Sequence, residues 1–258
     1  MKIVSILMVN DDSDVILPCL LNRVDNFDLT AIVDSSHDDT SDKINIFMQK
    51  HPGKFLYEYD TAPLTIKYFR TVLLKMLDGH ITDDDWIFQL DTDIFPCMNS
   101  GQLRAYVRQA ESMGSNCGVA DICQFYPTPE EINEGRDFMR FQYYSCNWRS
   151  RIIYKNRSKL FFRTDDQETP SVPDEKKYGA PFFVQHYQYR SPKQIQKKID
   201  RAFGIRSYSH IISQDWHDYI IDEEFLTEKI SSQGPWRRGG HSWRSLVKLT
   251  KEKREKNG

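Results

Sequence analysis

The hydrophobic period of the first ninety residues changes repeatedly, and this alternation is what most constrains the fold. Continuous apolar runs of strand length occupy 3–9 and 29–33, as is typical of parallel strands that are covered on both faces. Residues 65–77 instead carry their apolar side chains at helical spacing. A weaker third strand is predicted at 54–59 and a fourth at 85–90. Strands that alternate with helices in this way predict right-handed crossovers and a parallel α/β sheet flanked by helices.

Polar clusters follow three of these predicted strands, namely Asn10-Asp11-Asp12, Asp34-Ser35-Ser36 and Asp91-Thr92-Asp93. In open α/β sheets, ligands bind beyond the carboxyl ends of the strands. We therefore expect the binding site of this chain at these three strand ends.

Asp91 and Asp93 stand one residue apart, directly after the apolar segment WIFQL. Like charges at this spacing repel each other and lose hydration when they are covered, which predicts a positive partner. Two carboxylates at a strand end are typical of an Mg²⁺ or Mn²⁺ site that keeps coordination positions open for substrate phosphates. The alternative is that both aspartates only end the strand and cap a turn. A phosphatase-type pair of nucleophile and acid is disfavoured, because the motif follows the fourth predicted strand and continues with Phe95.

Composition excludes some classes of protein. The 258 residues are 39% hydrophobic and 13% aromatic, which is enough to bury a core, and the formal net charge of −2 provides no global attraction to nucleic acid. The five cysteines are odd in number and contain no C-x-x-C pair, which argues against a disulfide framework and a zinc site and favours a reduced, cytoplasmic compartment. The N-terminal apolar run is too short for a signal peptide, and no segment approaches the roughly 18 apolar residues of a membrane span.

The second half changes in character. A helix is predicted at 100–113 and a strand at 119–125, Thr128 and Glu131 have capping-box spacing, and Ser191 with Pro192 opens another helix. From Gly234 onward, eight lysine and arginine residues stand against two glutamates, a local net charge of +6. Such a tail suits peripheral contact with anionic lipid at the inner membrane face, and a solvated, frayed helix is the alternative.

Four segments in order resemble the family 2 glycosyltransferases. VSILMVNDDSDVILPCL resembles the opening strand and acidic turn of that family, and AIVDSSHDDT resembles its second strand and loop. IKYFRTVLLKMLDGHITDDDWIFQLDTDIF resembles the helix with an arginine that precedes the D-x-D strand, and FVQHYQYRSPKQIQKKI resembles a late His-Tyr, Arg-Ser pattern. The resemblance covers about residues 2–203.

The resemblance implies a GT-A type fold, a Rossmann-like and mostly parallel sheet with an acceptor-side lobe and a helical C-terminal extension. It also implies one glycosyltransferase domain over residues 1–233, followed by the basic tail 234–258. Within that domain, residues 1–98 would bind the nucleotide-sugar and residues 99–233 the acceptor.

The resemblance further implies the donor site. Asp34 would face the nucleobase, with a loop cap as the alternative role, and Arg70 would neutralise diphosphate or tie down the motif carboxylates. Asp93 would bind Mn²⁺ or Mg²⁺ directly, Asp91 would bind the ribose or the metal through water, and His186 would complete the metal shell or be a core residue. The implied nucleotide-sugar residues are Val9, Asn10, Asp12, Asp34, Lys67, Arg70, Asp91, Thr92 and Arg190.

An inverting transfer needs a carboxylate to take the proton of the acceptor hydroxyl. The related enzymes supply it after the D-x-D motif, and the candidates in that region are Asp174, then Glu175 and Asp166. An acceptor sugar would stack on aromatic side chains framed by cations, for which the candidates are Tyr144, Trp148 and Arg149; core packing is the alternative for the aromatic residues.

The function expected from the resemblance is a metal-dependent, inverting hexosyl- or deoxyhexosyltransferase. It would move a sugar from a UDP-, GDP- or dTDP-linked donor to a hydroxyl of a glycan or glycolipid. A sugar nucleotidylyltransferase should carry a glycine-rich, basic loop after its first strand, and NDDSDV contains neither glycine nor a basic residue. The remaining alternative is a non-catalytic nucleotide-sugar or glycan-binding module, which would bind without turnover.

Overall fold

The computed structural model describes residues 1–61, 65–155, 159–164, 169–204, 217, 220 and 246–248. The chain packs as two compact units, one of residues 1–120 with 150–183 and one of residues 121–149 with 184–258. The domain boundaries expected from the resemblance, and the contact of the basic tail with lipid, stay predictions.

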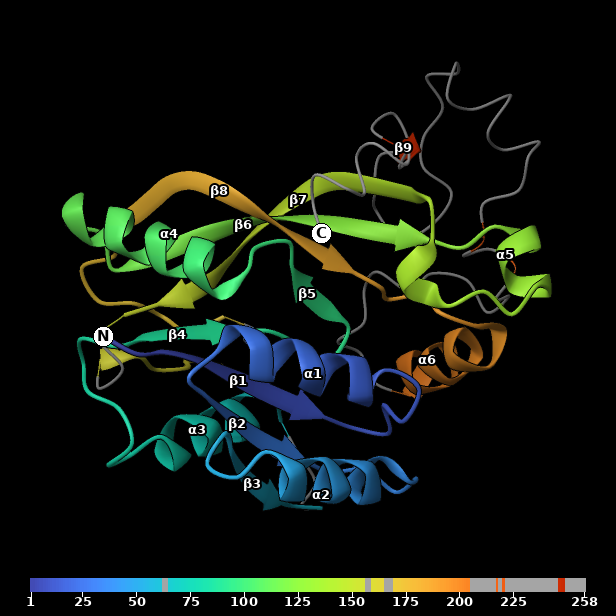
Figure 1. The fold of residues 1–258 in the computed structure, drawn as a ribbon, viewed down its shortest axis with the longest axis horizontal. Helices are drawn as coiled ribbons and strands as arrows, with labels where there is room; N and C mark the ends of the chain where they lie inside the picture. Colours follow the sequence, from blue (N-terminus) through green and yellow to red (C-terminus); the bar gives the residue numbers. More distant parts are fainter. Residues whose placement is uncertain are drawn as a thin grey trace. The chain divides into compact units, whose positions relative to one another are not determined.

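Four parallel strands form the part of the sheet that positions the site (Figure 1). They are β1 (Ile3–Val9), β2 (Leu29–Asp34), β3 (Phe55–Tyr59) and β4 (Trp86–Gln89), adjacent in the order β3-β2-β1-β4. Every residue of β2 and of β4 is buried, which is why these strands read as continuous apolar runs. The predicted parallel α/β sheet is confirmed.

Helices connect these strands: α1 (Ile16–Asn26), α2 (Thr40–Lys50) and α3 (Ile66–Met76). The hydroxyl of Thr65 caps α3 by accepting a hydrogen bond from the backbone N–H of Tyr68 at 3.2 Å. Phe69 and Leu73, at helical spacing on α3, pack against buried residues of β1, β2 and β4, including Ile87. The apolar stripe of this helix therefore covers the sheet, as its period predicts.

The rest of the chain extends the sheet. The strand order continues from β4 through β7, β6 and β8 to β5, with β9 beside β7, and β4 pairs with β7 in antiparallel orientation. Residues 246–248, the described part of the basic tail, form a strand rather than a helix. The elements are β5 (Ile94–Pro96), α4 (Ser100–Ser112), β6 (Cys117–Tyr126), α5 (Pro129–Asn133), a 3-10 turn (Phe138–Arg140), β7 (Tyr143–Tyr154), β8 (Lys177–His186), α6 (Pro192–Gly204) and β9 (Leu246–Lys248).

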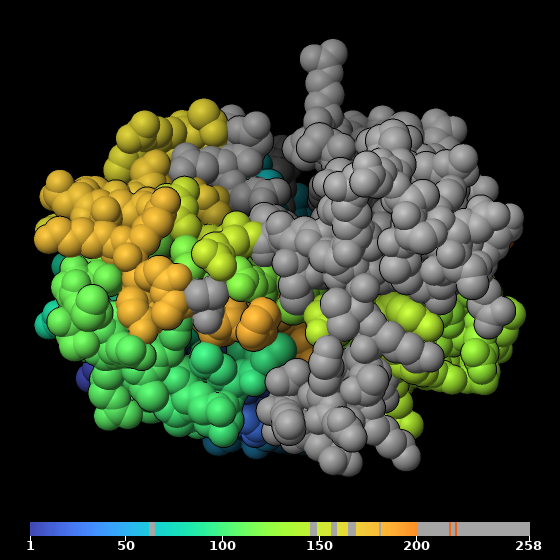
Figure 2. Space-filling model, turned by 90° about the horizontal axis from the view of Figure 1, so that it is seen from above, coloured from blue at the N-terminus to red at the C-terminus, as the bar shows by residue number. Residues whose placement is uncertain are grey.

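Local signals in the second half are also borne out. Thr128 and Glu131 form the predicted capping box at the start of α5, and the Ser191 hydroxyl accepts a hydrogen bond from the Gln194 backbone N–H at 3.2 Å at the start of α6. The ring of Tyr106 on α4 meets the ring of Phe182 on β8, with centroids 5.0 Å apart. These two elements lie side by side on the face shown in Figure 2.

Cysteine usage differs from the expectation. Cys123 is disulfide-bonded, whereas Cys19, Cys97 and Cys117 are free thiols. An odd number of cysteines excludes complete pairing but still allows one disulfide bond, so the count was too weak an argument. None of the described helices is long and apolar enough to cross a membrane.

Leu73→Ala tests the packing of α3 on the sheet. Leu73 has no exposed surface, so truncation should lower the free energy of unfolding by about 2–5 kcal/mol, measured by urea denaturation. Lys75→Ala on the exposed side of the same helix is the matched control and should change stability by less than about 0.5 kcal/mol. Equal effects of the two substitutions would contradict the observed orientation of α3.

Candidate functional site

The register of the parallel strands brings their carboxyl ends to one edge of the sheet. Val9 at the end of β1 lies opposite Asp34 at the end of β2, which in turn lies opposite Tyr59 at the end of β3. Gln89, the last residue of β4, pairs with Ile6 of β1. The three polar clusters that follow β1, β2 and β4 therefore leave the same edge.

Hydrogen bonds join the loop after β1 to the loop after β2. The side-chain amide of Asn10 donates to the Ser35 hydroxyl at 2.6 Å, and the backbone N–H of Asp11 donates to the Ser36 hydroxyl at 2.8 Å. The Asp11 carboxylate accepts from the backbone N–H of His37 at 2.5 Å. Asp11 has a φ of 51°, a left-handed conformation that aspartate tolerates better than most residues. The two loops thus form one bonded structure.

Asp34 is fully buried within this structure. One carboxylate oxygen accepts from the Ser36 backbone N–H at 2.9 Å, and the other accepts from the hydroxyls of Ser41 at 2.6 Å and Tyr57 at 2.9 Å. Burial, together with the hydrogen bond to Asp34, raises the pKa of Tyr57 to about 12. Asp34 therefore organises its own loop, the alternative role that its sequence position left open, and because it has no exposed surface, neighbouring groups would have to move before it could contact a nucleobase.

The D-x-D motif forms a tight turn after β4. The Asp91 carbonyl accepts from the Ile94 backbone N–H at 3.1 Å, so that Thr92 and Asp93 are the two central residues of the turn. The Thr92 hydroxyl donates to the Asp12 carboxylate at 2.9 Å, which ties the motif to the loop after β1. Asp93 is 6% exposed. All three polar clusters are thereby connected.

Arg70 provides a positive charge next to the motif. Its Nη2 donates to Asp91 Oδ1 at 2.8 Å, and the residue is 3% exposed whereas the Asp91 side chain is half-exposed. Its Nε and Nη1 atoms are buried and have no hydrogen-bond partner among the described residues. Such N–H groups are the donors that phosphate and carboxylate oxygens bind.

Arg23, on α1, is a residue of this region that the sequence analysis missed. It is 1% exposed, and its Nη2 donates to two carbonyls of the motif turn, that of Asp91 at 3.1 Å and that of Ile94 at 2.9 Å. Burial lowers the pKa of this guanidinium, opposed by the nearby negative groups. An arginine within the apolar stripe of a helix that also contains Ile16 and Leu20 was the available signal.

His186 and Arg190 belong to the second unit. His186 ends β8 and is buried. The Nη1 of Arg190 donates to the Tyr187 carbonyl at 3.0 Å, and its guanidinium lies 6.0 Å from the centre of the Phe138 ring. Arg190 is thus built into the packing around the start of α6, and the predicted roles of His186 and Arg190 at a metal and a donor stay predictions.

The predicted acceptor residues lie on β7 in the second unit. Tyr144 stacks on Phe125, with ring centroids 5.2 Å apart, and Arg149 donates from Nε to the Asp121 carboxylate at 2.7 Å. The side chain of Trp148 lies outside the described part of the structure. Tyr144 therefore belongs to an aromatic stack, and Arg149 is held as an exposed ion pair.

The predicted catalytic acids have contacts of their own. The Glu175 carboxylate binds Arg151 and also Lys177, whose Nζ lies 3.0 Å away. Although burial opposes the change, these two cations hold the pKa of Glu175 below its usual range, which makes it a weaker base. Asp174 is exposed, and its carbonyl accepts from the side-chain amide of Asn116 at 3.3 Å. Asp166 lies outside the described residues.

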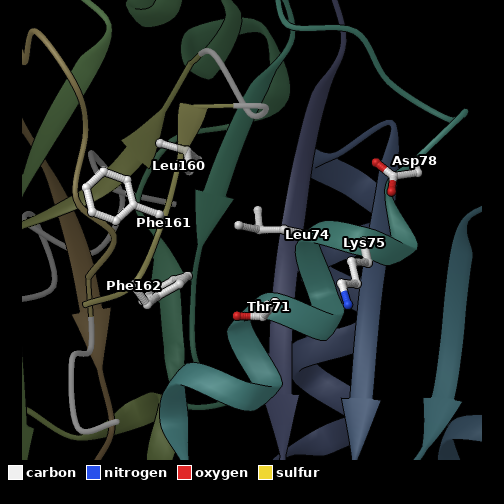
Figure 3. A pocket seen from close by; sticks show the side chains of 7 residues that line it. All are labelled: Thr71, Leu74, Lys75, Asp78, Leu160, Phe161 and Phe162. Atoms are coloured by element: carbon white, nitrogen blue, oxygen red, sulfur yellow. The ribbon is translucent and has the colours of Figure 1, made fainter. Parts of the chain in front are cut away.

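Lys67, predicted near the donor, donates from Nζ to the Arg163 carbonyl at 3.4 Å. This places it against the segment that follows residue 159, and its predicted role near the donor stays a prediction. Close to this segment, a cavity of about 310 Å³ opens between α3 and residues 160–162 (Figure 3). None of its lining residues was predicted for the site; they are Thr71, Leu74, Lys75, Asp78, Leu160, Phe161 and Phe162.

Among the residues that the structure describes, no three His, Cys, Asp or Glu side chains gather as a metal site. Asp91 and Asp93 nonetheless supply two hard oxygen donors on one turn. Mg²⁺ and similar ions are often held by one or two carboxylates, with water and substrate phosphate completing the shell. The chemistry of the donor set therefore fits a divalent cation that arrives with its substrate.

Tyr57→Phe removes the hydroxyl that donates to the buried Asp34 carboxylate. It should lower the free energy of unfolding by about 1.5–3 kcal/mol, the usual range for a hydrogen bond to a charged group. Tyr59→Phe is the control, because the half-exposed Tyr59 donates to a neutral carbonyl, that of Ser36, at 3.1 Å. Urea denaturation at pH 7 measures both.

Because the pKa of Tyr57 is raised, the difference in free energy of unfolding between wild type and Tyr57→Phe should depend on pH. The folded protein retains a phenolic proton that the unfolded chain releases near pH 10. The contribution of Tyr57 is therefore complete below about pH 10 and is lost as the pH rises through about 12. The difference between wild type and Tyr57→Phe should shrink across this window, and a constant difference would contradict the assignment.

No protein-family model and no curated protein sequence matches the chain. Solved structures of similar fold include residues 1–349 of S. aureus TarS, which are 13% identical to this chain. The match covers 90% of this chain and 73% of that chain, with a TM-score of 0.45. A longer TarS structure is covered over 44% of its length. The structure of GalNAc-T7 with UDP, GalNAc and Mn²⁺ is 9% identical. The match covers 81% of this chain and 50% of that chain, with a TM-score of 0.46. A 4-diphosphocytidyl-2C-methyl-D-erythritol synthase is 12% identical. The match covers 61% of this chain and 76% of that chain, with a TM-score of 0.36.

Proposed function

We propose that this chain is a metal-dependent glycosyltransferase. It moves a hexosyl or deoxyhexosyl group from a nucleoside diphosphate sugar to a hydroxyl of a glycan or glycolipid, with inversion. The observation that supports this most is the bonded set of three polar loops at the carboxyl edge of a parallel sheet, with the buried Arg70 paired to Asp91. A sheet edge of this kind is where α/β proteins bind nucleotides.

In this proposal the loops after β1 and β2 hold the nucleoside. Val9 is buried at the end of β1, and its carbonyl accepts a hydrogen bond from the Ser35 backbone N–H at 3.0 Å. Asn10 and the loop after Asp34 would then form the surface on which the nucleoside lies. Thr92 and Asp12 brace each other at the side of the motif. These groups are already hydrogen-bonded to one another before the donor binds. Donor binding therefore pays little conformational entropy for ordering the loops.

Arg70 is the proposed anion-binding residue. It is almost fully buried, and in a low-dielectric position its charge acts more strongly on an approaching phosphate than it would in water. Its contact with Asp91 also lowers the repulsion within the motif. Arg70 would therefore hold the carboxylates in place and attract the diphosphate of the donor.

Mn²⁺ or Mg²⁺ would bind at Asp93 and Asp91, with His186 proposed as a third ligand. When bound, such an ion acts as a Lewis acid that stabilises negative charge on the departing diphosphate. The protein's own part is to present two carboxylates on a turn that is fixed to β1 and α1 through Thr92 and Arg23.

Asp174 is the proposed general base. Its carboxylate is exposed, whereas Glu175 is engaged by two cations that lower its pKa. The acceptor would meet Tyr144, Trp148 and Arg149. The stack of Tyr144 on Phe125 and the ion pair of Arg149 would give a sugar an aromatic surface beside a cation.

A second candidate is a binding module without turnover. The pairing of Asp91 with Arg70 favours it, because that carboxylate already has a cation at 2.8 Å. The two functions differ in one result: a binding module retains the donor intact, whereas the enzyme releases nucleoside diphosphate from it.

Asp93 tests the donor site. Calorimetry with UDP, GDP and dTDP, each with and without Mn²⁺, should show one nucleotide that binds wild type only with the metal. Asp93→Asn, which keeps the shape and removes the charge, should weaken that binding at least about 10- to 100-fold, the loss that removing even a supporting partner of a metal ligand causes. Asp78→Asn, at an exposed position after α3, is the matched control and should bind normally.

Two results would end the transferase proposal: wild type that binds no nucleoside diphosphate, or Asp93→Asn that binds like wild type. Release of nucleoside diphosphate from the matching sugar donor then separates the enzyme from the binding module.

His186→Ala tests the third metal ligand. If the imidazole binds the ion, the Mn²⁺ concentration for half-maximal nucleotide binding should rise at least about tenfold. A lower melting temperature with unchanged Mn²⁺ dependence would show that His186 is only a core residue.

A further inference from the structure

We infer that Arg23 is a positioning residue that holds the backbone of the D-x-D turn in place. This inference rests on the proposed function. One guanidinium nitrogen, Nη2, donates to the carbonyls of both Asp91 and Ile94. These residues are the two ends of the four-residue turn, which the Ile94 backbone N–H closes on the Asp91 carbonyl at 3.1 Å. Arg23 thus clamps the turn by its backbone, whereas Arg70 contacts a side chain.

The guanidinium is itself held firmly. Its Nη1 donates to the Asn22 side chain at 2.7 Å, and its central carbon lies 5.8 Å from the centre of the Phe27 ring. Phe27 meets Phe88 of β4 edge to face, with ring centroids 5.3 Å apart. Arg23 therefore connects α1 and β4 to the turn through packed groups, which is the arrangement that holds a functional side chain to a defined position.

This position matters for the motif because Asp93 is part of the same turn. It is a central residue of the turn, so its carboxylate moves with the backbone that Arg23 clamps. Displacements of about 1 Å are enough to cost large factors in function at such sites. A buried positive charge behind Asp91 and Asp93 also offsets their mutual repulsion while the cation is absent.

A purely structural arginine would fill the same space and satisfy the same carbonyls, so stability alone cannot test the inference. Arg104 on α4 is the matched control. Its Nη2 donates to Asp28 at 2.5 Å, and Asp28 also accepts from the Ile3 backbone N–H at 2.8 Å at the start of β1. Arg104→Met therefore removes an arginine that braces the sheet away from the turn.

The experiment compares wild type, Arg23→Met, Arg23→Lys and Arg104→Met. Each is titrated with Mn²⁺ in the presence of whichever of UDP, GDP and dTDP binds wild type best, and its melting temperature is recorded. Both methionine variants should melt earlier. Only Arg23→Met should need at least about tenfold more Mn²⁺ for half-maximal binding, as is usual when a supporting partner of a metal ligand is removed. Arg23→Lys keeps the positive charge but loses the planar guanidinium, so its Mn²⁺ concentration for half-maximal binding should lie between those of wild type and Arg23→Met.

Hydrogen exchange of the Ile94 amide provides a readout that does not depend on binding. It should become faster in Arg23→Lys while the amides of β1 keep their protection. If Arg23→Met fails to fold, Phe27→Leu, which removes the ring beside the guanidinium, replaces it with the same expectation.

The outcomes separate the two proposals. A folded Arg23 variant with wild-type Mn²⁺ dependence and wild-type exchange at Ile94 overturns the positioning role and leaves the transferase proposal standing. An equal rise in the Mn²⁺ concentration that Arg104→Met needs for half-maximal binding also overturns it, because the effect would then follow general stability. Wild type that binds no nucleotide overturns both.

Discussion

The candidate site depends on the parallel pairing of β1 with β2 and β4. Parallel strands end at the same edge, and here the register places Val9 directly opposite Asp34. Because the strands are buried on both faces, a slip of register would put their apolar side chains in the wrong surroundings. The hydrophobic core thereby determines where the polar loops meet, and the Val9 carbonyl at its edge also accepts a hydrogen bond from the Ser35 backbone N–H at 3.0 Å.

Gathering five aspartates at one edge creates an electrostatic cost that the structure offsets in two ways. Backbone N–H groups and hydroxyls solvate Asp11 and Asp34, while two buried arginines lie next to the motif turn. The arginines act at different levels, one on a carboxylate and one on carbonyls. The folded site is therefore organised before any cation or phosphate reaches it, which is the condition for electrostatic preorganisation.

Hydrophobic period was sufficient to predict β1 to β4, α3 and the parallel sheet, because those segments are buried in regular patterns. β7 was not predicted, because charged and polar residues such as Arg149 and Arg151 interrupt its apolar side chains. Arg23 was missed for a related reason: its role depends on a turn that lies 68 residues away in sequence from its first carbonyl partner. The ion pair of Glu175 with Arg151 is likewise a contact between segments that are separated in sequence.

The clamp on the motif turn also limits how α1 can evolve. In any amphipathic helix, an added or lost residue turns part of the apolar stripe away from the core. In α1, one residue added or lost between Ile16 and Arg23 would rotate the guanidinium by about 100° around the helix axis. The turn would then face an apolar or solvent-directed side chain, so the register of this outer helix is as constrained as that of an inner strand.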